Sequence, residues 1–224
     1  MELVLFDLDG TLIQTDSDHA FGDFLIQEGW IDGAEFKARN DAFYDDYLAG
    51  KLDLPAYVAF STSAWRTRPA AEAMALRERF MQQVMRPAIT PKALELVQSH
   101  QRSGHLVAIV TATNEFVTAP IAQAFGVEHL IALQLVPQAD GEGLYTGNIK
   151  GIPTFREGKI QRVEHWLNSL GRQCSDFTAV HCYSDSINDL PLLEWATHPV
   201  ATNPGKTLEA VAQQRAWPIL RLFE

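Results

Sequence analysis

The sequence has few cysteines, no excess of basic residues and no long apolar run, and each shortage narrows what the protein can be. Only Cys174 and Cys182 occur in 224 residues, too few for a disulfide framework, although one bridge stays open. Lys and Arg number 18 against 28 Asp and Glu, and the net charge of −10 disfavours nucleic acid and anionic membranes as partners. No segment approaches the roughly 20 apolar residues that span a bilayer. Met1 leads into an apolar segment without a leader pattern, so we expect a cytoplasmic protein with reduced thiols.

The pattern of apolar residues predicts an α/β fold. Short apolar runs bounded by turn signals indicate strands at 3–6, 106–110, 129–132, 177–183 and 199–201. Helical patterns separate these runs, and alternating strands and helices predict a doubly wound parallel sheet. A hairpin is expected from 133–137 and 144–149, with its turn at Asp140 to Gly143.

A long helical segment interrupts this alternation after the first strand. From His19 to about Met85 the pattern is helical, and aromatic residues recur in it at helical spacing. The segment predicts a small helical bundle whose aromatic residues form its own core. We therefore expect a core domain of residues 1–14 and 87–224, and an all-helical cap domain of residues 15–86.

Polar side chains follow three of the expected strands at the points where the strands end. Asp7 and Asp9 follow the first strand, Thr111 follows the second, and Asp185 and Asp189 follow the fourth. Because ligands bind beyond the carboxyl ends of parallel strands, these side chains should meet in space. Alone, the first pair would fit an ordinary polar turn, and Thr111 would fit a helix cap.

The chemistry of these residues suits a phosphate and a divalent cation. The carboxylates of Asp7, Asp9 and Asp185 form an all-oxygen set of hard ligands, which suits Mg²⁺. Thr111 precedes a helix whose N-terminal amides favour an anion. Lys159 offers a fixed positive charge, although one more solvated lysine is the plainer interpretation.

In this order the motifs resemble those of the haloacid dehalogenase (HAD) superfamily. They are the segment DLDGT at 7–11, the strand ending at Thr111, Lys159, and the segment DSIND at 185–189. The helical insert resembles the C1-type cap of the phosphoserine-phosphatase-like branch, subfamily IB. The resemblance covers essentially the whole chain and implies a HAD-like Rossmannoid core with an inserted cap.

The resemblance also implies a phosphatase mechanism. Asp7 would attack phosphorus and form an aspartyl-phosphate, and Asp9 would act as general acid and then general base. Mg²⁺ would be held by Asp7, the backbone carbonyl of Asp9 and Asp185, with Asp189 supporting these ligands. The residues expected to bind the phosphoryl oxygens are Thr111, Lys159 and Asn188.

The segment after the nucleophile bears on the substrate. Phosphoserine phosphatases carry an acidic residue nine positions after the nucleophile, which holds the substrate ammonium; Asp16 has that offset and Asp18 is close by. Capping of the next helix explains the same two residues equally well. The cap arginine that grips a substrate carboxylate in those enzymes has no counterpart at 56–63, although Arg66 and Arg68 follow. An ammonium partner without a carboxylate partner favours a phosphorylated amino alcohol.

Segments 16–24, 39–44 and 183–193 resemble the bacterial HAD-type histidinol-phosphatases. L-Histidinol phosphate is accordingly the substrate that we favour. The alternatives are phosphoserine hydrolysis or another small-metabolite phosphatase or phosphotransferase activity, and, below these, a non-catalytic phospho-ligand sensor. The oligomeric state is left open. The residues expected to line the substrate pocket are Asp16, Asp18, His19, Trp30 and Tyr44.

Overall fold

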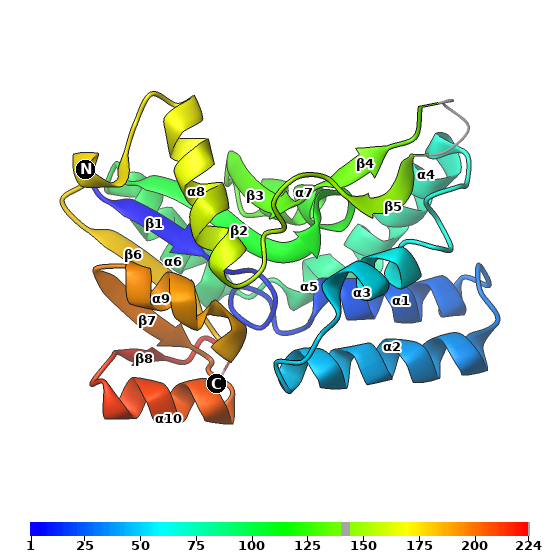
Figure 1. Ribbon diagram of the computed structural model, residues 1–224, viewed down its shortest axis with the longest axis horizontal. Helices are drawn as coiled ribbons and strands as arrows, with labels where there is room; N and C mark the ends of the chain where they lie inside the picture. Colours follow the sequence, from blue (N-terminus) through cyan, green and yellow to red (C-terminus); the bar gives the residue numbers. More distant parts are fainter. Residues whose placement is uncertain (140–143, 224) are drawn as a thin grey trace.

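A parallel β-sheet forms the centre of the computed structural model, which describes residues 1–139 and 144–223 (Figure 1). Its strand order is β3-β2-β1-β6-β7-β8, and every neighbouring pair is parallel. The strands are β1 (Leu3–Phe6), β2 (Leu106–Asn114), β3 (His129–Leu133), β6 (Val180–Ser184), β7 (His198–Thr202) and β8 (Ile219–Leu220). The expected α/β fold is confirmed. The edge strand β8 was not predicted, because two residues are too short to show alternation.

Helices cover both faces of the sheet. The central strand β1 is fully buried, and its side chains alternate between the faces: Val4 and Phe6 pack into one apolar cluster, Leu3 and Leu5 into the other. This burial on both faces explains the unbroken apolar run. The first cluster includes α6 (Pro91–Arg102) and α7 (Glu115–Ala124). The second includes α8 (Glu157–Ser169), α9 (Leu190–Trp195) and α10 (Lys206–Gln214).

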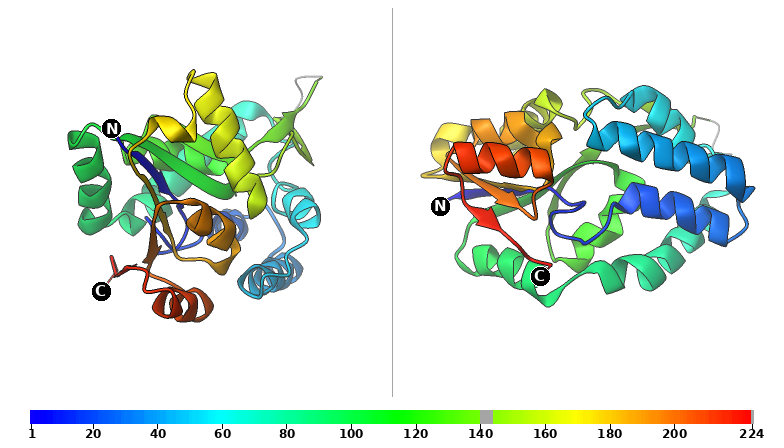
Figure 2. Two further views of the ribbon diagram at one scale, coloured as in Figure 1. Left: turned by 60° about the vertical axis from the view of Figure 1, so that its left-hand side comes forward. Right: turned by 90° about the horizontal axis from the view of Figure 1, so that it is seen from below.

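The segment inserted after β1 is helical, and residues 15–86 contain no strand. Its helices are α1 (Ser17–Gln27), α2 (Gly33–Leu48), α3 (Leu54–Ser61), α4 (Ala70–Phe80), a π-helical turn (Met81–Met85) and α5 (Arg86–Ala88). Figure 2 shows α1 and α2 side by side, on the side of the molecule away from α9 and α10. Ile13 and Ile89 form an antiparallel bridge, so the insert leaves and rejoins the sheet at one place. This bridge supports our proposal that residues 15–86 are a cap on a core of 1–14 and 87–224.

Contacts near the hairpin and α7 help to fix the insert against the rest of the chain. Trp65 stacks on Phe116 of α7, with ring centroids 4.2 Å apart. A hairpin of β4 (Leu135–Pro137) and β5 (Tyr145–Ile149) contacts the insert at the residue after Trp65. The backbone N–H groups of Leu144 and Tyr145 donate to the Arg66 carbonyl at 2.8 and 3.4 Å. The expected turn at 140–143 lies outside the described residues. None of the helices in the described ranges is long and apolar enough to cross a membrane.

Candidate active site

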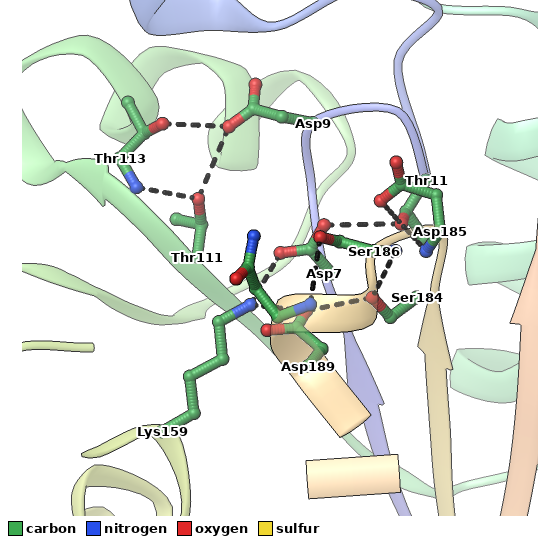
Figure 3. A network of polar contacts seen from close by, with 11 residues as sticks. Asp7, Asp9, Thr11, Thr111, Thr113, Lys159, Ser184, Asp185, Ser186 and Asp189 are labelled. Carbon is green, nitrogen blue, oxygen red and sulfur yellow. Dashed lines mark hydrogen bonds and ion pairs between the residues drawn. The ribbon is translucent and has the colours of Figure 1, made fainter. Parts of the chain in front are cut away.

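A buried lysine joins two carboxylates at the carboxyl ends of β1 and β6 (Figure 3). Lys159 is 2% exposed, and its Nζ donates to Asp7 Oδ1 at 2.7 Å and to Asp189 Oδ2 at 2.6 Å. The Ser184 hydroxyl donates to the same Asp189 oxygen at 2.8 Å. Burial alone would lower the pKa of Lys159, but the charges of Asp189 and Asp7 outweigh it and raise the pKa above its ordinary value. The ammonium is therefore a fixed positive charge.

The start of α8 places this lysine. Lys159 lies in the first turn of the helix, directly after Gly158. A Cβ atom on Gly158 would lie 2.1 Å from the Pro153 carbonyl oxygen, so only glycine lets the helix begin this close to the preceding loop. Arg156, one residue before the helix, has a left-handed backbone with φ of 50°. Its side chain thereby points to the helical insert and not along α8.

The carboxylates of Asp7 and Asp185 share one hydroxyl. Thr11 Oγ1 lies 3.2 Å from Asp7 Oδ2 and 3.1 Å from Asp185 Oδ1, and it accepts the Asp185 backbone N–H at 3.0 Å. A hydroxyl has one proton, so it serves only one of the two carboxylates at a time. Gly10, with φ of 72°, makes the turn that brings them together; a Cβ there would lie 2.4 Å from Asp185 Oδ2.

The electrostatics of this pair suit a bound cation. Burial, and then the negative charges of Asp7 and Asp189, raise the pKa of Asp185 well above its ordinary value. Burial raises the pKa of Asp7 to about 7 even though Lys159 opposes the shift. Because the Thr11 hydroxyl has one proton, it leaves either the Asp7 oxygen or the Asp185 oxygen without its donor. Carboxylate oxygens are ligands that suit Mg²⁺. The donor set therefore fits the metal that the motifs imply.

Asp9 has its own set of donors. The Ser17 backbone N–H donates to Asp9 Oδ1 at 2.7 Å, and the Thr113 hydroxyl donates to Oδ2 at 2.8 Å. The Thr111 hydroxyl is 3.4 Å from Oδ2 and accepts the Thr113 backbone N–H at 3.1 Å. Burial, together with the charge of Asp16, raises the pKa of Asp9 to about 7. Such a group can give and take a proton near neutral pH.

Asn188 touches the helical insert. It lies on a 3₁₀ turn (Ile187–Asp189), and its side-chain amide donates to the Tyr47 carbonyl at 2.9 Å. The Arg156 guanidinium donates to the Gly50 carbonyl, and its Nε is 3.5 Å from Asn188 Oδ1. Two side chains of the sheet domain thus hold the last turn of α2 and the residues after it.

A pocket enclosing about 500 Å³ of empty space, part of it open to solvent, lies over these groups. We call its strand-end residues the pocket floor: Asp7, Asp9, Thr111, Ala112 and Thr113. We call its residues from the insert the pocket wall: Asp16, Asp18, Phe43, Tyr44, Tyr47, Leu52, Leu54 and Tyr57. Acidic and aromatic side chains dominate this lining, and no Lys, Arg or His is among its described residues.

The two acidic residues of the wall have different partners. Asp16 is the N-cap of α1, and its Oδ1 accepts the His19 backbone N–H at 2.8 Å. Asp18 is 7% exposed and accepts a hydrogen bond from the Asn114 side-chain amide at 3.3 Å. Tyr44 also lines the pocket, whereas His19 is not among the lining residues.

The two arginines that follow α3 lie elsewhere. Arg66 donates to the Ala59 carbonyl at 2.8 Å, and Arg68 lies over the Trp30 ring at 5.0 Å from its centroid. Neither arginine lines the pocket, and nor does Trp30. The described lining therefore offers no cationic group to a substrate carboxylate.

Sequence reasoning assigned no role to several residues of this network. Thr113 lies two residues beyond Thr111 in an extended segment, so a period of two places both on one side, and this signal was available. Thr11 belongs to the DLDGT motif, but only the turn at Gly10 reveals its contact with Asp185. No sequence pattern marked Arg156, because the contact of its side chain with the insert depends on the left-handed backbone at this residue.

A second acidic group lies on the surface of the insert. His19, Asp23 and Asp41 bring ligand atoms within 4.8 Å of one another, close enough to hold a metal ion. Lys37 Nζ lies 3.3 Å from Asp23 and 3.1 Å from Asp41. The lysine already balances part of this charge, so we do not assign the group a metal.

Comparison with known proteins gives the family. Residues 4–194 match the family model of the haloacid dehalogenase-like hydrolases. The chain is 42% identical over 218 residues to a histidinol-phosphatase of Neisseria meningitidis, with 97% of each chain covered. It is 30% identical over 224 residues to a phosphoserine phosphatase of Mycobacterium tuberculosis, covering 96% of this chain and 68% of that one.

Solved structures share the fold. A protein of unknown function from Bordetella pertussis superposes with a TM-score of 0.92 at 45% identity, with 99% of each chain covered. A substrate-bound phosphoserine phosphatase superposes with a TM-score of 0.67 at 19% identity, covering 98% of this chain and 92% of that one, which shows a common fold. The family model spans most of the chain, and the family resemblance predicted from the motifs is confirmed. The chain belongs to the haloacid dehalogenase-like hydrolases and is a phosphatase of that family.

Proposed function

We propose that this phosphatase hydrolyses a small phosphorylated amino alcohol, with L-histidinol phosphate as the favoured substrate, through an aspartyl-phosphate on Asp7 and with Mg²⁺. The observation that carries the substrate class is the pocket lining, whose described residues combine carboxylates and aromatic rings without a basic side chain. A cationic substrate suits such a lining, and a substrate carboxylate does not. The histidinol-phosphatase of Neisseria meningitidis, a full-length relative, supports the same choice.

The proposed reaction has two displacements at phosphorus. An oxygen of the Asp7 carboxylate forms a bond to phosphorus, the ester P–O bond breaks, and Asp9 gives its proton to the departing alkoxide. Asp9 then takes a proton from water as the water oxygen attacks phosphorus. This step breaks the Asp7–phosphate bond and releases inorganic phosphate. The pKa of Asp9, raised to about 7, suits a group that alternates between acid and base.

Several neighbours would neutralise the phosphoryl charge. Lys159 uses two of its three N–H donors on Asp7 and Asp189, so the third is available for a phosphoryl oxygen. Asn188 uses one amide hydrogen on the insert and has a second, and Thr111 has a hydroxyl. Positioning and charge neutralisation of this kind make up most of the catalysis of phosphoryl transfer.

The fit of the oxygen ligands supports a metal in the same place. Asp7, Asp185 and the backbone carbonyl of Asp9 would hold Mg²⁺, with Asp189 behind them. When bound, the ion would offset the mutual repulsion of the carboxylates and of the substrate phosphate. Removal of Mg²⁺ by a chelator should abolish the activity.

Three other functions have weaker support from the pocket and its residues. Phosphoserine carries a carboxylate for which the described lining offers no cation, although a relative of 30% identity is a phosphoserine phosphatase. A phosphotransferase would use the same groups and pass the phosphate to an alcohol. A non-catalytic sensor would have no need of a nucleophile and a proton donor.

The two cysteines are free thiols, which suits the reducing cytoplasm, and we propose the cytoplasm as the location of this protein.

A panel of phosphate esters tests the proposal. We expect kcat/KM for L-histidinol phosphate to exceed that for phosphoserine by about tenfold or more, which corresponds to about 1.4 kcal/mol of selective binding. Asp7→Asn should abolish turnover of both esters, because an amide oxygen cannot replace the carboxylate as nucleophile. Equal or faster hydrolysis of phosphoserine would refute the proposed substrate. Activity that survives in Asp7→Asn would refute the mechanism.

A further inference from the structure

We infer that Asp18, together with Tyr57 and Asn114, selects the nitrogen-bearing end of the substrate, whereas Asp16 chiefly caps helix α1. This inference rests on the proposed function, a phosphatase for a cationic phosphate ester. It assigns the specificity to a residue that lies two positions beyond the one suggested by the family offset. It also names two partners, from α3 and from the end of β2, that no sequence motif indicates.

Asn114 is fixed so that it presents a donor to Asp18. Its Oδ1 accepts the Val117 backbone N–H at 3.2 Å and so caps α7. The opposite atom of the amide, Nδ2, then faces Asp18 Oδ1 at 3.3 Å. Both side chains are buried, so the Asp18 carboxylate is held in a defined place.

The hydroxyl groups of α3 complete the surroundings of Asp18. The Tyr57 hydroxyl interacts with Asp18, and Tyr57 lines the pocket. The Ser61 hydroxyl is buried and also lies near Asp18, but Ser61 is not among the residues that line the pocket. Of these two hydroxyl groups, the one that a ligand in the pocket can reach is therefore that of Tyr57.

These groups match the chemistry of an amine or an imidazole. A carboxylate accepts N–H hydrogen bonds, and the oxygen of the Tyr57 hydroxyl can accept one from an ammonium group or a ring N–H. In the described part of the chain, no residue that lines the pocket is a cation that could pair with Asp18. A positively charged group of the substrate would therefore be its natural counterion.

Asp16 has already committed one carboxylate oxygen to the helix. Its Oδ1 accepts the backbone N–H of His19, which is the ordinary bond of an N-cap residue. Asparagine caps a helix about as well as aspartate. Asp16→Asn therefore removes one negative charge from the pocket wall and keeps the cap, which makes it a matched control for Asp18→Asn.

The test compares the two variants on esters with and without a nitrogen group. The substrates are L-histidinol phosphate, phosphoethanolamine, phosphoserine and p-nitrophenyl phosphate, all assayed with saturating Mg²⁺. The readout is kcat/KM of each amine ester divided by kcat/KM of the aryl ester. We expect Asp18→Asn to lower this ratio about 30-fold, mostly through KM, which is the size expected for loss of a charged hydrogen bond. Asp16→Asn should lower it by about threefold or less, because the helix cap is kept and the effect of the lost charge on Asp9 falls on all esters alike.

The outcomes separate the inference from the proposed function. The preference between histidinol phosphate and phosphoserine tests the substrate; the fall in the ratio for the better amine ester tests Asp18. Equal losses in both variants, a larger loss in Asp16→Asn, or a wild-type ratio near one would overturn the assignment to Asp18. Should Asp18→Asn fail to fold, Tyr57→Phe gives a second test. It should lower the same ratio about fivefold, the effect of one neutral hydrogen bond, and an unchanged ratio would refute the role of this cluster.

Discussion

The pocket floor and the pocket wall balance their charges in different ways. Beneath the floor, Lys159 lies within 2.7 Å of Asp7 and 2.6 Å of Asp189. In the wall, Asp16 and Asp18 have hydrogen-bond donors but no cation among the described lining residues. The floor thus has a counterion directly beneath it, and the described residues of the wall provide none.

This difference assigns separate tasks to the two parts of the chain. The floor comes from strand ends of a buried sheet, which hold the reacting carboxylates in fixed positions, and α8 holds the ammonium of Lys159 beneath them (Figure 3). The wall comes from the helical insert and offers charge and aromatic surface to whatever the substrate carries besides phosphate. Changes in the floor should therefore affect every substrate, and changes in the wall should affect only some.

Removal of the internal counterion should have the largest effect. Lys159→Met leaves two buried carboxylates without their ammonium, so we expect activity on all esters to fall by about 10²- to 10³-fold. The free energy of unfolding should fall by about 3 kcal/mol, because breaking a buried ion pair leaves uncompensated charge. Initial rates and urea unfolding measure the two effects.

The matched control for this variant is Lys150→Met, which changes an exposed lysine. Its rate and unfolding midpoint should stay close to those of the wild type. A Lys159→Met protein that keeps its activity on aryl phosphate would show that the floor does not depend on this ammonium, and the contrast between floor and wall would fail.

The contact between the sheet domain and the insert should have a smaller effect. Arg156 and Asn188 donate to the carbonyls of Gly50 and Tyr47, so Arg156→Ala removes part of the hold on the wall. We expect KM to rise about fivefold with kcat changed less, because a loosened wall costs binding free energy of about 1 kcal/mol. Steady-state kinetics with histidinol phosphate measure this split.

Arg172 provides the comparison, since it lies against the Phe177 ring and not at the insert. Arg172→Ala should leave both constants as they are in the wild type. A fall in kcat without a change in KM in Arg156→Ala would indicate that the arginine acts on the floor instead, and would break the assignment of this contact to the wall.

The same contrast explains what could be predicted from the sequence. The floor residues and Asp185 follow strands, and a parallel sheet brings strand ends to one edge, so Asp7, Thr111 and Asp185 could be grouped from their positions in the chain. Their individual hydrogen bonds could not be foreseen. The sharing of the Thr11 hydroxyl, for example, depends on the left-handed turn at Gly10.

The wall was harder to predict because helical periodicity does not say which polar residue faces a distant segment. The sequence left Asp16 and Asp18 equal as caps or ligands. In the structure, Asp16 caps α1, and Asp18 meets Asn114 from the end of β2, a contact between residues far apart in the chain. The strand β8 was missed for a related reason, since pairing with β7 and not its own short pattern defines it.

A smaller effect, on the pH dependence of stability, would sharpen the contrast between floor and wall further. Burial raises the pKa of Asp18 from 3.8 to about 7 in the folded protein. The folded state therefore binds more protons than the unfolded state between these values, and stability falls as the pH rises through about 7. In metal-free protein, the urea midpoint should be higher at pH 6 than at pH 8, and Asp18→Asn should reduce that difference. Asp46→Asn, which changes an exposed carboxylate of α2, should leave the difference as it is in the wild type. A difference that stays as large in Asp18→Asn as in the wild type would mean that Asp18 already has a counterion within the protein, and the wall would then resemble the floor.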